Sequence, residues 1–262
     1  MNKRTARAVL LGAAGAAGLA LFCSRRGWTP AALHGAIRTA CLPGNARRYS
    51  LKNVKRLPQS PLAGKHLIFL GSSVTYGAAS QGVSFADYLA ARHGFSMTKE
   101  AVSGTTLTDD GPDSYVARLR RLNRSLPADL FICQLSTNDA SQGKPLGELS
   151  PSFDPDSFDV HTVAGAMETI VSYVRTVWGC PIVFYTNPRY DSKPYAAMVE
   201  LLHRLCEKWQ ITAIDLWSDP RFNASAQGRY ALYMADPIHP TKAGYWEWWT
   251  PYMETRLCER IE

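Results

Sequence analysis

The sequence lacks the residue spacings that bind structural metals. Its six cysteines form no Cys-x-x-Cys pair and no Cys/His cluster, so we expect no zinc site. An acidic loop contains Asp154, Asp156 and Asp159, but the glycine and the closing glutamate of an EF-hand loop are absent, which argues against calcium. Cys133 and Cys180 lie in or beside apolar runs and are expected in the core, whereas a bridge from Cys41 to Cys206 or Cys258 stays open.

The sequence also has no apolar run long enough for a comfortable membrane span, which needs ~20 residues. Its longest candidate, 8–23, is rich in Ala and Gly and is flanked by cations on both sides: Lys3, Arg4, Arg7, Arg25 and Arg26. A charged start followed by a short apolar stretch is typical of export segments. We therefore predict a signal-anchor or signal peptide over 1–28, with a buried soluble helix as the alternative. The main domain is then soluble and membrane-anchored or exported, in a bacterial cell envelope.

A basic balance without an aromatic platform argues against nucleic-acid binding. The formal charge is +7, but much of the excess lies before residue 57, and aromatic residues do not alternate with Lys and Arg along an expected strand. The mixed, proline-containing stretch 29–61 is expected to be a linker or an arm that wraps the domain. Residues 62–262 suffice for one domain with a large core.

From residue 65 onward, short apolar runs alternate with longer amphipathic stretches. The runs predict strands over 66–70, 98–102, 130–135, 182–186 and 212–216. The intervening stretches predict helices over 85–92, 114–123, 163–178, 195–209 and 243–259, the last kinked or broken at Pro251. This alternation is typical of an α/β fold, with a parallel sheet between two helical layers.

Small polar residues follow the first three predicted strands. Ser72 and Ser73 come after the first, Ser103-Gly104 after the second, and Ser136-Thr137-Asn138-Asp139 after the third. Near the end of the chain lies Asp236-Pro237-Ile238-His239. Each block alone is compatible with an ordinary turn or helix cap. Because a parallel sheet gathers the carboxyl ends of its strands at one edge, together they predict a serine, a base and an orienting acid at that edge.

These four blocks, in this order and spacing, resemble those of the SGNH (GDSL-type) esterase/lipase superfamily. The resemblance covers 65–262 and implies a flavodoxin-like fold with a five-stranded parallel sheet. It also implies Ser73 as nucleophile, His239 as base and Asp236 as the residue that orients the base. Two positions depart from the family pattern: Ser72 replaces the usual Asp before the nucleophile, and Ser136 replaces the usual Gly of the third block.

The same resemblance implies an oxyanion hole formed by the backbone N–H groups of Ser73 and Gly104 and by the side-chain amide of Asn138. The reaction would be ester hydrolysis through an acyl-enzyme, with no metal and no organic cofactor. Small acyl esters of envelope glycans or lysophospholipids are the expected substrates, and Tyr76, Asn187 and Arg189 are candidate contacts to them. An acyltransferase using the same residues and a non-catalytic binding domain stay open. Oligomeric state is not predicted.

Overall fold

The computed structural model describes residue 35 and residues 37–259, and the chain divides into two units, Met1–Cys41 and Leu42–Glu262. The predicted export segment 1–28 lies outside the described residues. Among the residues that are described, no helix has both the length and the apolar character needed to cross a bilayer.

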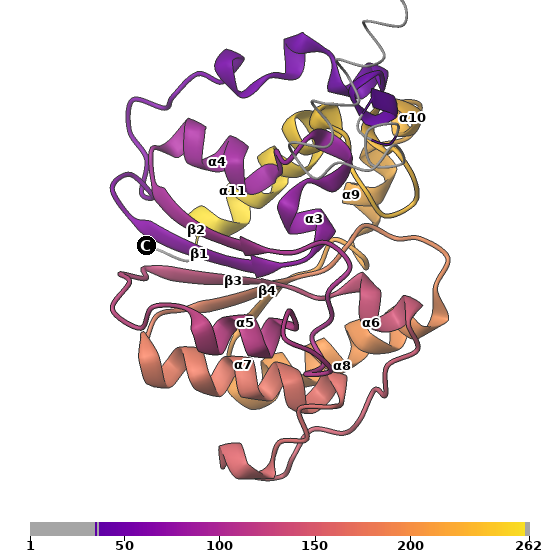
Figure 1. The fold of residues 1–262 in the computed structure, drawn as a ribbon. Helices are drawn as coiled ribbons and strands as arrows, with labels where there is room; N and C mark the ends of the chain where they lie inside the picture. Colours follow the sequence, from indigo (N-terminus) through magenta and orange to yellow (C-terminus); the bar gives the residue numbers. More distant parts are fainter. Residues whose placement is uncertain (1–34, 36, 260–262) are drawn as a thin grey trace, which may run out of the picture. The chain divides into compact units, whose positions relative to one another are not determined.

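The second unit is built on five parallel strands in the order β2-β1-β3-β4-β5 (Figure 1). The strands are β1 His66–Gly71, β2 Ser96–Ala101, β3 Leu130–Gln134, β4 Ile182–Tyr185 and β5 Thr212–Ile214. All five predicted strands are present, with ends that differ by one or two residues. The central strands β3 and β4 are buried throughout, which explains why their sequences are apolar except for Gln134 at the end of β3.

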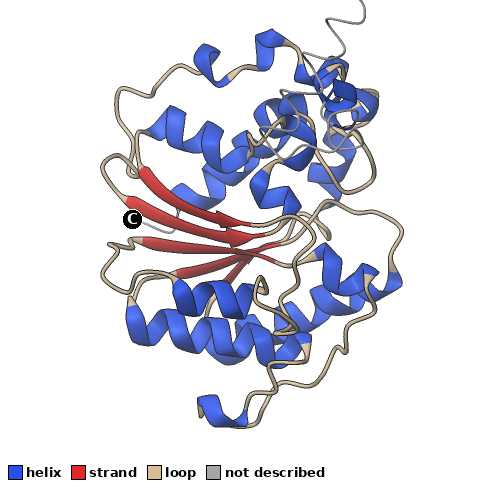
Figure 2. Ribbon diagram, in the orientation of Figure 1, coloured by secondary structure: helices blue, strands red, loops and turns tan. Residues whose placement is uncertain are grey.

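Helices cover both faces of the sheet, so the predicted α/β class and its three layers are confirmed (Figure 2). One layer contains α5 Tyr115–Arg121, α7 Val163–Val177 and α8 Lys193–Trp209, and the other contains α4 Phe85–His93 and α11 Thr250–Cys258. Alternate strand residues point to the two layers. Ile68 and Leu70 join the core under α7 and α8, while Leu67 and Phe69 join the core under α4 and α11.

The final helical segment differs from the prediction at its proline. A π-helical turn, Gly244–Trp249, passes directly into α11, and Pro251 is the second residue of that helix. A proline in the first turn of an α-helix removes an N–H that has no helical partner there. Pro251 therefore marks a change of helix type rather than a break.

The arm Leu42–Pro61 belongs to the same compact unit as the sheet, so the domain begins at Leu42 and not at 62. It contains three short 3₁₀ helices, Pro43–Asn45, Arg47–Tyr49 and Leu51–Asn53. Tyr49 is buried, and its carbonyl accepts a hydrogen bond from the Tyr88 hydroxyl. The Asn45 amide donates to the Ala79 carbonyl at 2.8 Å, and the Leu57 N–H donates to the Arg92 carbonyl at 2.7 Å.

Candidate active site

The turn that presents Ser73 follows β1 directly. Ser72 precedes the short helix α3, Ser73–Tyr76, so the strand passes into a helix within one residue. Gly71 is required at the end of the strand, since a Cβ there would lie 1.7 Å from Thr75 Oγ1. Such a sharp strand-to-helix turn holds a serine hydroxyl at the carboxyl edge of a parallel sheet.

Gln134, the last residue of β3, holds this turn in place through hydrogen bonds. Its buried Oε1 accepts hydrogen bonds from Ser72 N at 3.0 Å, Thr75 N at 3.2 Å and Thr75 Oγ1 at 2.8 Å. The Thr75 hydroxyl also lies 2.6 Å from the Tyr185 hydroxyl. A single side-chain oxygen thus satisfies two backbone donors at the start of α3, which would otherwise be unpaired and buried.

Arg118 of α5 forms hydrogen bonds to the backbone next to the same turn. Its guanidinium is buried and donates to the carbonyls of Gly71 and Glu100, each at 2.8 Å, and to the Asp113 carbonyl at 2.9 Å. These bonds connect the carboxyl ends of β1 and β2. Hydrogen bonds from a charged donor are stronger than those from a neutral one, so Arg118 holds these strand ends firmly together.

The loop before the terminal helices presents Asp236 and His239. It is closed by a hydrogen bond from Ala235 N to the His239 carbonyl at 2.9 Å, and Asp236 Oδ1 accepts from the backbone N–H groups of Ile238 and His239 at 2.8 and 2.9 Å. The turn therefore orients the carboxylate by its own backbone, as an Asx-turn does.

The structure brings Ser73, His239 and Asp236 together. Asp236 Oδ2 lies 2.8 Å from His239 Nδ1, and His239 Nε2 lies 2.8 Å from Ser73 Oγ, across 166 positions of sequence. Burial alone would raise the pKa of Asp236, but hydrogen bonds from the His239 ring and the Ile238 N–H outweigh it and hold that pKa below its usual value. The arrangement supplies a hydroxyl, a base in contact with it, and an ionised orienting group.

The second and third blocks lie beside this turn. Gly71 pairs with Ala101 at the strand ends, so the chain leaves β1 and β2 side by side toward Ser73 and Gly104. Gly104 has φ +83°, and no atom lies within 4 Å of an added Cβ. The positive φ, which a residue with a Cβ rarely adopts, explains a glycine at this position.

Asn138 lies in the first turn of α6, Thr137–Ser141, and its amide donates to the Thr105 carbonyl at 2.8 Å. An amide nitrogen has two hydrogens, so one N–H is left for a ligand. The neighbouring Asp139 is buried and accepts from Leu107 N at 2.8 Å and Thr108 N at 3.1 Å. Burial raises the pKa of Asp139 despite these bonds, and the carboxylate anchors the chain that follows Gly104.

The three predicted substrate contacts lie in different surroundings. Asn187 is fully buried and its amide N–H donates to the Ile238 carbonyl, whereas its Oδ1 has no hydrogen-bond partner among the described residues, so a contact with substrate stays a prediction. Arg189 is exposed, with its guanidinium 5.8 Å from the centre of the Trp217 ring. Tyr76 is 45% exposed at the end of α3. Arg189 and Tyr76 stay predictions.

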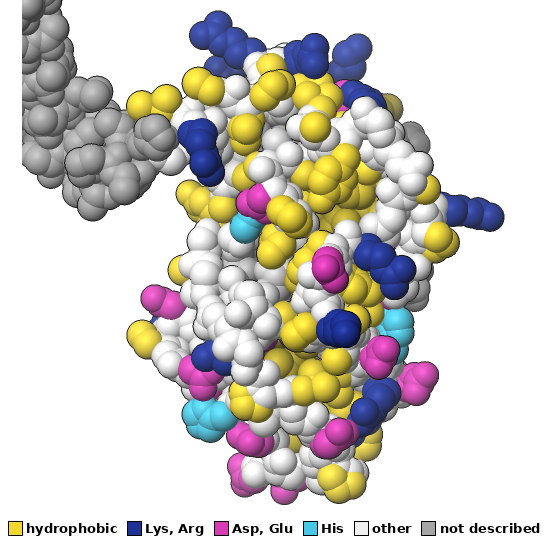
Figure 3. All heavy atoms as spheres, turned by 90° about the vertical axis from the view of Figure 1, so that its right-hand side faces the viewer, with side chains coloured by type: hydrophobic (Ala, Val, Ile, Leu, Met, Phe, Trp, Pro, Cys, Tyr) yellow, Lys and Arg dark blue, Asp and Glu magenta, His cyan; other side chains and the backbone are white. Residues whose placement is uncertain are grey.

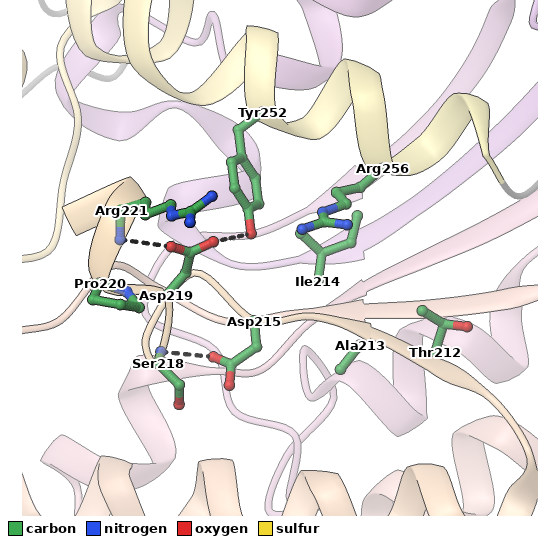
Figure 4. A pocket seen from close by; sticks show the side chains of 10 residues that line it. All are labelled: Thr212, Ala213, Ile214, Asp215, Ser218, Asp219, Pro220, Arg221, Tyr252 and Arg256. Atoms are coloured by element: carbon green, nitrogen blue, oxygen red, sulfur yellow. Dashed lines mark hydrogen bonds between the residues drawn. The ribbon is translucent and has the colours of Figure 1, made fainter. Parts of the chain in front are cut away.

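A separate cavity of about 570 Å³ runs along the outer edge of β5 and contains none of the predicted catalytic residues (Figure 4). In it the Asp219 carboxylate accepts from the Tyr252 hydroxyl at 2.6 Å and from the backbone N–H of Arg221 at 2.8 Å. Its polar groups therefore have partners within the protein. Within residues 35 and 37–259, no three His, Cys, Asp or Glu side chains are grouped as metal ligands would be.

The sequence matches the model of the GDSL-like lipase/acylhydrolase family over residues 69–247. The chain belongs to this family. It is a carboxylic ester hydrolase of the GDSL type. No curated protein matches the sequence of the esterase.

Solved structures share the fold of the esterase at low sequence identity. A protein from Lactobacillus plantarum has 20% identity and a TM-score of 0.62, with 75% of this chain and 98% of that chain covered. A protein from Bacteroides ovatus assigned as a GDSL-like lipase has 17% identity and a TM-score of 0.57, with 75% and 99% covered. An active-site mutant of a family two carbohydrate esterase from Clostridium thermocellum has 15% identity and a TM-score of 0.53, with 78% and 65% covered.

Sequence reasoning missed the residues that support the site from below. Gln134 is the one polar residue in the apolar run 130–135, and a lone amide in a buried strand indicates a specific hydrogen-bonding task. Arg118 lies in a helix whose other cations face solvent, and no feature of the sequence separates it from Arg120 or Arg121. Thr75 follows the nucleophile by two residues, so its closeness to the serine motif was a signal that could have found it.

Proposed function

We propose that this protein is a serine esterase that hydrolyses carboxylic esters of small acyl groups through an acyl-enzyme on Ser73. The observation that supports it most directly is the 2.8 Å contact between Ser73 Oγ and His239 Nε2, with Asp236 on the other ring nitrogen. A general base must lie within hydrogen-bond reach of the proton that it removes, and this histidine does.

In the acylation step, His239 Nε2 takes the proton of the Ser73 hydroxyl while Oγ attacks the ester carbonyl carbon. The tetrahedral oxyanion receives hydrogen bonds from Ser73 N, Gly104 N and the second amide hydrogen of Asn138. The protonated imidazole then gives its proton to the departing alkoxide, which leaves as the alcohol. Asp236 stabilises the imidazolium and keeps Nδ1 protonated. Water activated by the same histidine releases the acid and restores Ser73.

Exposed apolar side chains close in sequence to the site residues support an ester with an apolar portion. Five large hydrophobic side chains are exposed among the described residues, and three of them are close in sequence to site residues: Tyr76, Val102 and Tyr230. Burial, and to a smaller extent the Asp236 carboxylate, raise the pKa of Tyr230. Figure 3 shows this edge of the sheet, where hydrophobic side chains lie among scattered charged ones.

Covalent labelling with a fluorophosphonate probe tests the proposal. Wild type should label and hydrolyse p-nitrophenyl acetate, while Ser73→Ala should do neither and unfold at the same denaturant midpoint. Ser72→Ala is the matched control, because it removes the adjacent hydroxyl and should retain labelling. A series of p-nitrophenyl esters from acetate to octanoate measures acyl preference, and product analysis with an added alcohol separates hydrolysis from acyl transfer. Equal labelling of Ser73→Ala and wild type would exclude Ser73 as nucleophile.

A further inference from the structure

The arm Leu42–Pro61 carries positive charge only. Its five cations are all exposed, and it contains no Asp or Glu: Arg47, Arg48, Lys52, Lys55 and Arg56. Beneath them Tyr49 is buried, and Leu51 and Val54 pack against the core. The arm thus has an apolar inner side that fixes it to the domain and a basic outer side. We call the outer side, formed by these five cations, the basic face.

The domain does not neutralise the basic face. In the part of the chain that the structure describes, none of the five cations forms an ion pair or a side-chain hydrogen bond. The acidic residues on the helices of this layer are already paired. Asp87 lies 2.6 Å from Lys99, Glu254 lies 2.9 Å from Arg92, and Glu247 lies 2.5 Å from Arg229.

Two of the five cations lie against neighbouring groups of the protein. The Arg48 guanidinium lies 4.8 Å from the centre of the Tyr49 ring, and the Arg56 guanidinium covers Gly94, where an added Cβ would meet it at 2.1 Å. Figure 3 shows Lys and Arg side chains gathered along the upper end of the molecule, where the arm runs in Figure 1. A face of one charge sign without ion-pair partners attracts an extended anionic partner.

The surrounding sequence identifies the kind of partner. The first acidic residue of the chain is Asp87, and residues 24–41 connect the arm to an apolar run, 8–23, that has cations on both sides. Clusters of Lys and Arg next to an apolar segment bind anionic lipid surfaces, with about 1 kcal/mol contributed by each cation near the surface. The described exposed large hydrophobics lie outside the arm, so it offers no aromatic platform for nucleic-acid bases.

We propose that the basic face docks on an anionic phospholipid bilayer. The arm begins beside the active site, since Asn45 Oδ1 accepts a 2.9 Å hydrogen bond from the backbone N–H of Lys242, three residues after His239. Docking therefore holds the catalytic edge close to the lipid surface. The inference depends on the charge of the arm and not on the proposed reaction.

Vesicle binding by the full chain tests the inference. Binding to vesicles of phosphatidylcholine alone measures the affinity that does not depend on lipid charge, including that of the other segments of the chain. The affinity gained when phosphatidylglycerol is included measures the electrostatic contribution to binding. The variant with all five cations of the basic face changed to Gln should lose on the order of 10³-fold of that added affinity. The wild-type increment should also fall as salt is raised.

A matched control removes five exposed cations from the opposite helical layer: Arg120, Arg121, Arg124, Lys193 and Arg204, each changed to Gln. It should keep the phosphatidylglycerol increment, and both variants should hydrolyse p-nitrophenyl acetate as wild type does. The inference is overturned if the arm variant retains the increment, or if the control loses as much. Arm-dependent binding to duplex DNA without a phosphatidylglycerol increment would likewise overturn it.

Discussion

The side-chain amide of Asn187 donates a 3.0 Å hydrogen bond to the carbonyl oxygen of Ile238, the residue before His239. Asn187 is itself fixed, because its backbone N–H donates to the Tyr195 hydroxyl at 2.9 Å, and that hydroxyl donates to the Leu135 carbonyl at 3.1 Å. The loop that presents the base is therefore connected through β4 and α8 to the end of β3. Asn187 is a positioning residue for His239.

Asn187→Ala should lower kcat by about 10- to 100-fold with little change in KM, because one buried hydrogen bond to the catalytic loop is worth about 1–3 kcal/mol. Steady-state kinetics on p-nitrophenyl acetate measure both constants. Arg189→Gln provides the contrast: as a rim residue it should change KM and leave kcat unaltered. A higher KM at normal kcat for Asn187→Ala would assign Asn187 to substrate binding after all.

The sequence predicted the parts of the site whose chemistry is visible in a short motif. Ser73, His239 and Asp236 are recognisable because each lies in a short turn motif. A serine, a histidine and an aspartate in such motifs together indicate nucleophilic catalysis. The five strands were recognisable from their apolar runs. The contact between Ser73, His239 and Asp236 depends on the topology. The sheet places β1 beside β3, and the chain brings the loop that contains Asp236 and His239 back to the same edge.

The rest depended on three-dimensional partners that no local pattern encodes. Asn187 follows a strand at the expected edge, as a ligand-binding residue would, but its amide meets Ile238, which is 51 positions away. The prolines and cations of 29–61 predicted a linker or an arm that wraps the domain, and could not decide between the two. Tyr49, Leu51 and Val54 fix it to the domain through contacts that only the folded chain provides.

Gln134→Met tests whether the turn that presents Ser73 needs its buried acceptor. Met has a similar length but cannot accept from Ser72 N and Thr75 N, so two buried donors lose their partner. We expect a loss of about 2–4 kcal/mol in the free energy of unfolding and a lower kcat. Tyr185→Phe is the control: it removes a hydroxyl that contacts Thr75 and lies 3.5 Å from Gln134 Oε1, and it leaves the bonds from Ser72 N and Thr75 N to Gln134 in place. Denaturant unfolding and kcat are measured for both, and an unchanged kcat in Gln134→Met would remove its positioning role.

Asp236→Asn tests the charge of the orienting group without dismantling the turn, because an Asn Oδ1 still accepts from the N–H groups of Ile238 and His239. We expect kcat to fall by about 10²–10⁴-fold, since a neutral amide neither stabilises the imidazolium nor selects the required tautomer. The matched control is Asp110→Asn, which removes a carboxylate paired with Lys144 at 2.8 Å, away from the triad. A kcat for Asp236→Asn within a few-fold of wild type would contradict the assigned role.

His93 makes stability depend on pH near neutrality. It ends α4 with a buried ring, its Nδ1 2.7 Å from Ser60 Oγ and its Nε2 3.3 Å from Glu254 Oε1. Burial lowers the pKa of His93, assisted by Arg92 and opposed by Glu254, and the net pKa lies below its ordinary value. In the unfolded chain the same histidine titrates near ~6.5.

As the pH falls below about 6.5, the unfolded state therefore binds a proton that the folded state still excludes. The stability contributed by His93 is complete above that pH and is lost as the pH falls toward the lowered pKa of the folded state. His93→Gln should flatten the fall in unfolding free energy between about pH 6.5 and pH 5, measured by urea denaturation. His161→Gln, which changes an exposed histidine, should leave the wild-type slope unchanged. If His93→Gln kept the full slope, a group other than His93 would have to account for the loss of stability in acid.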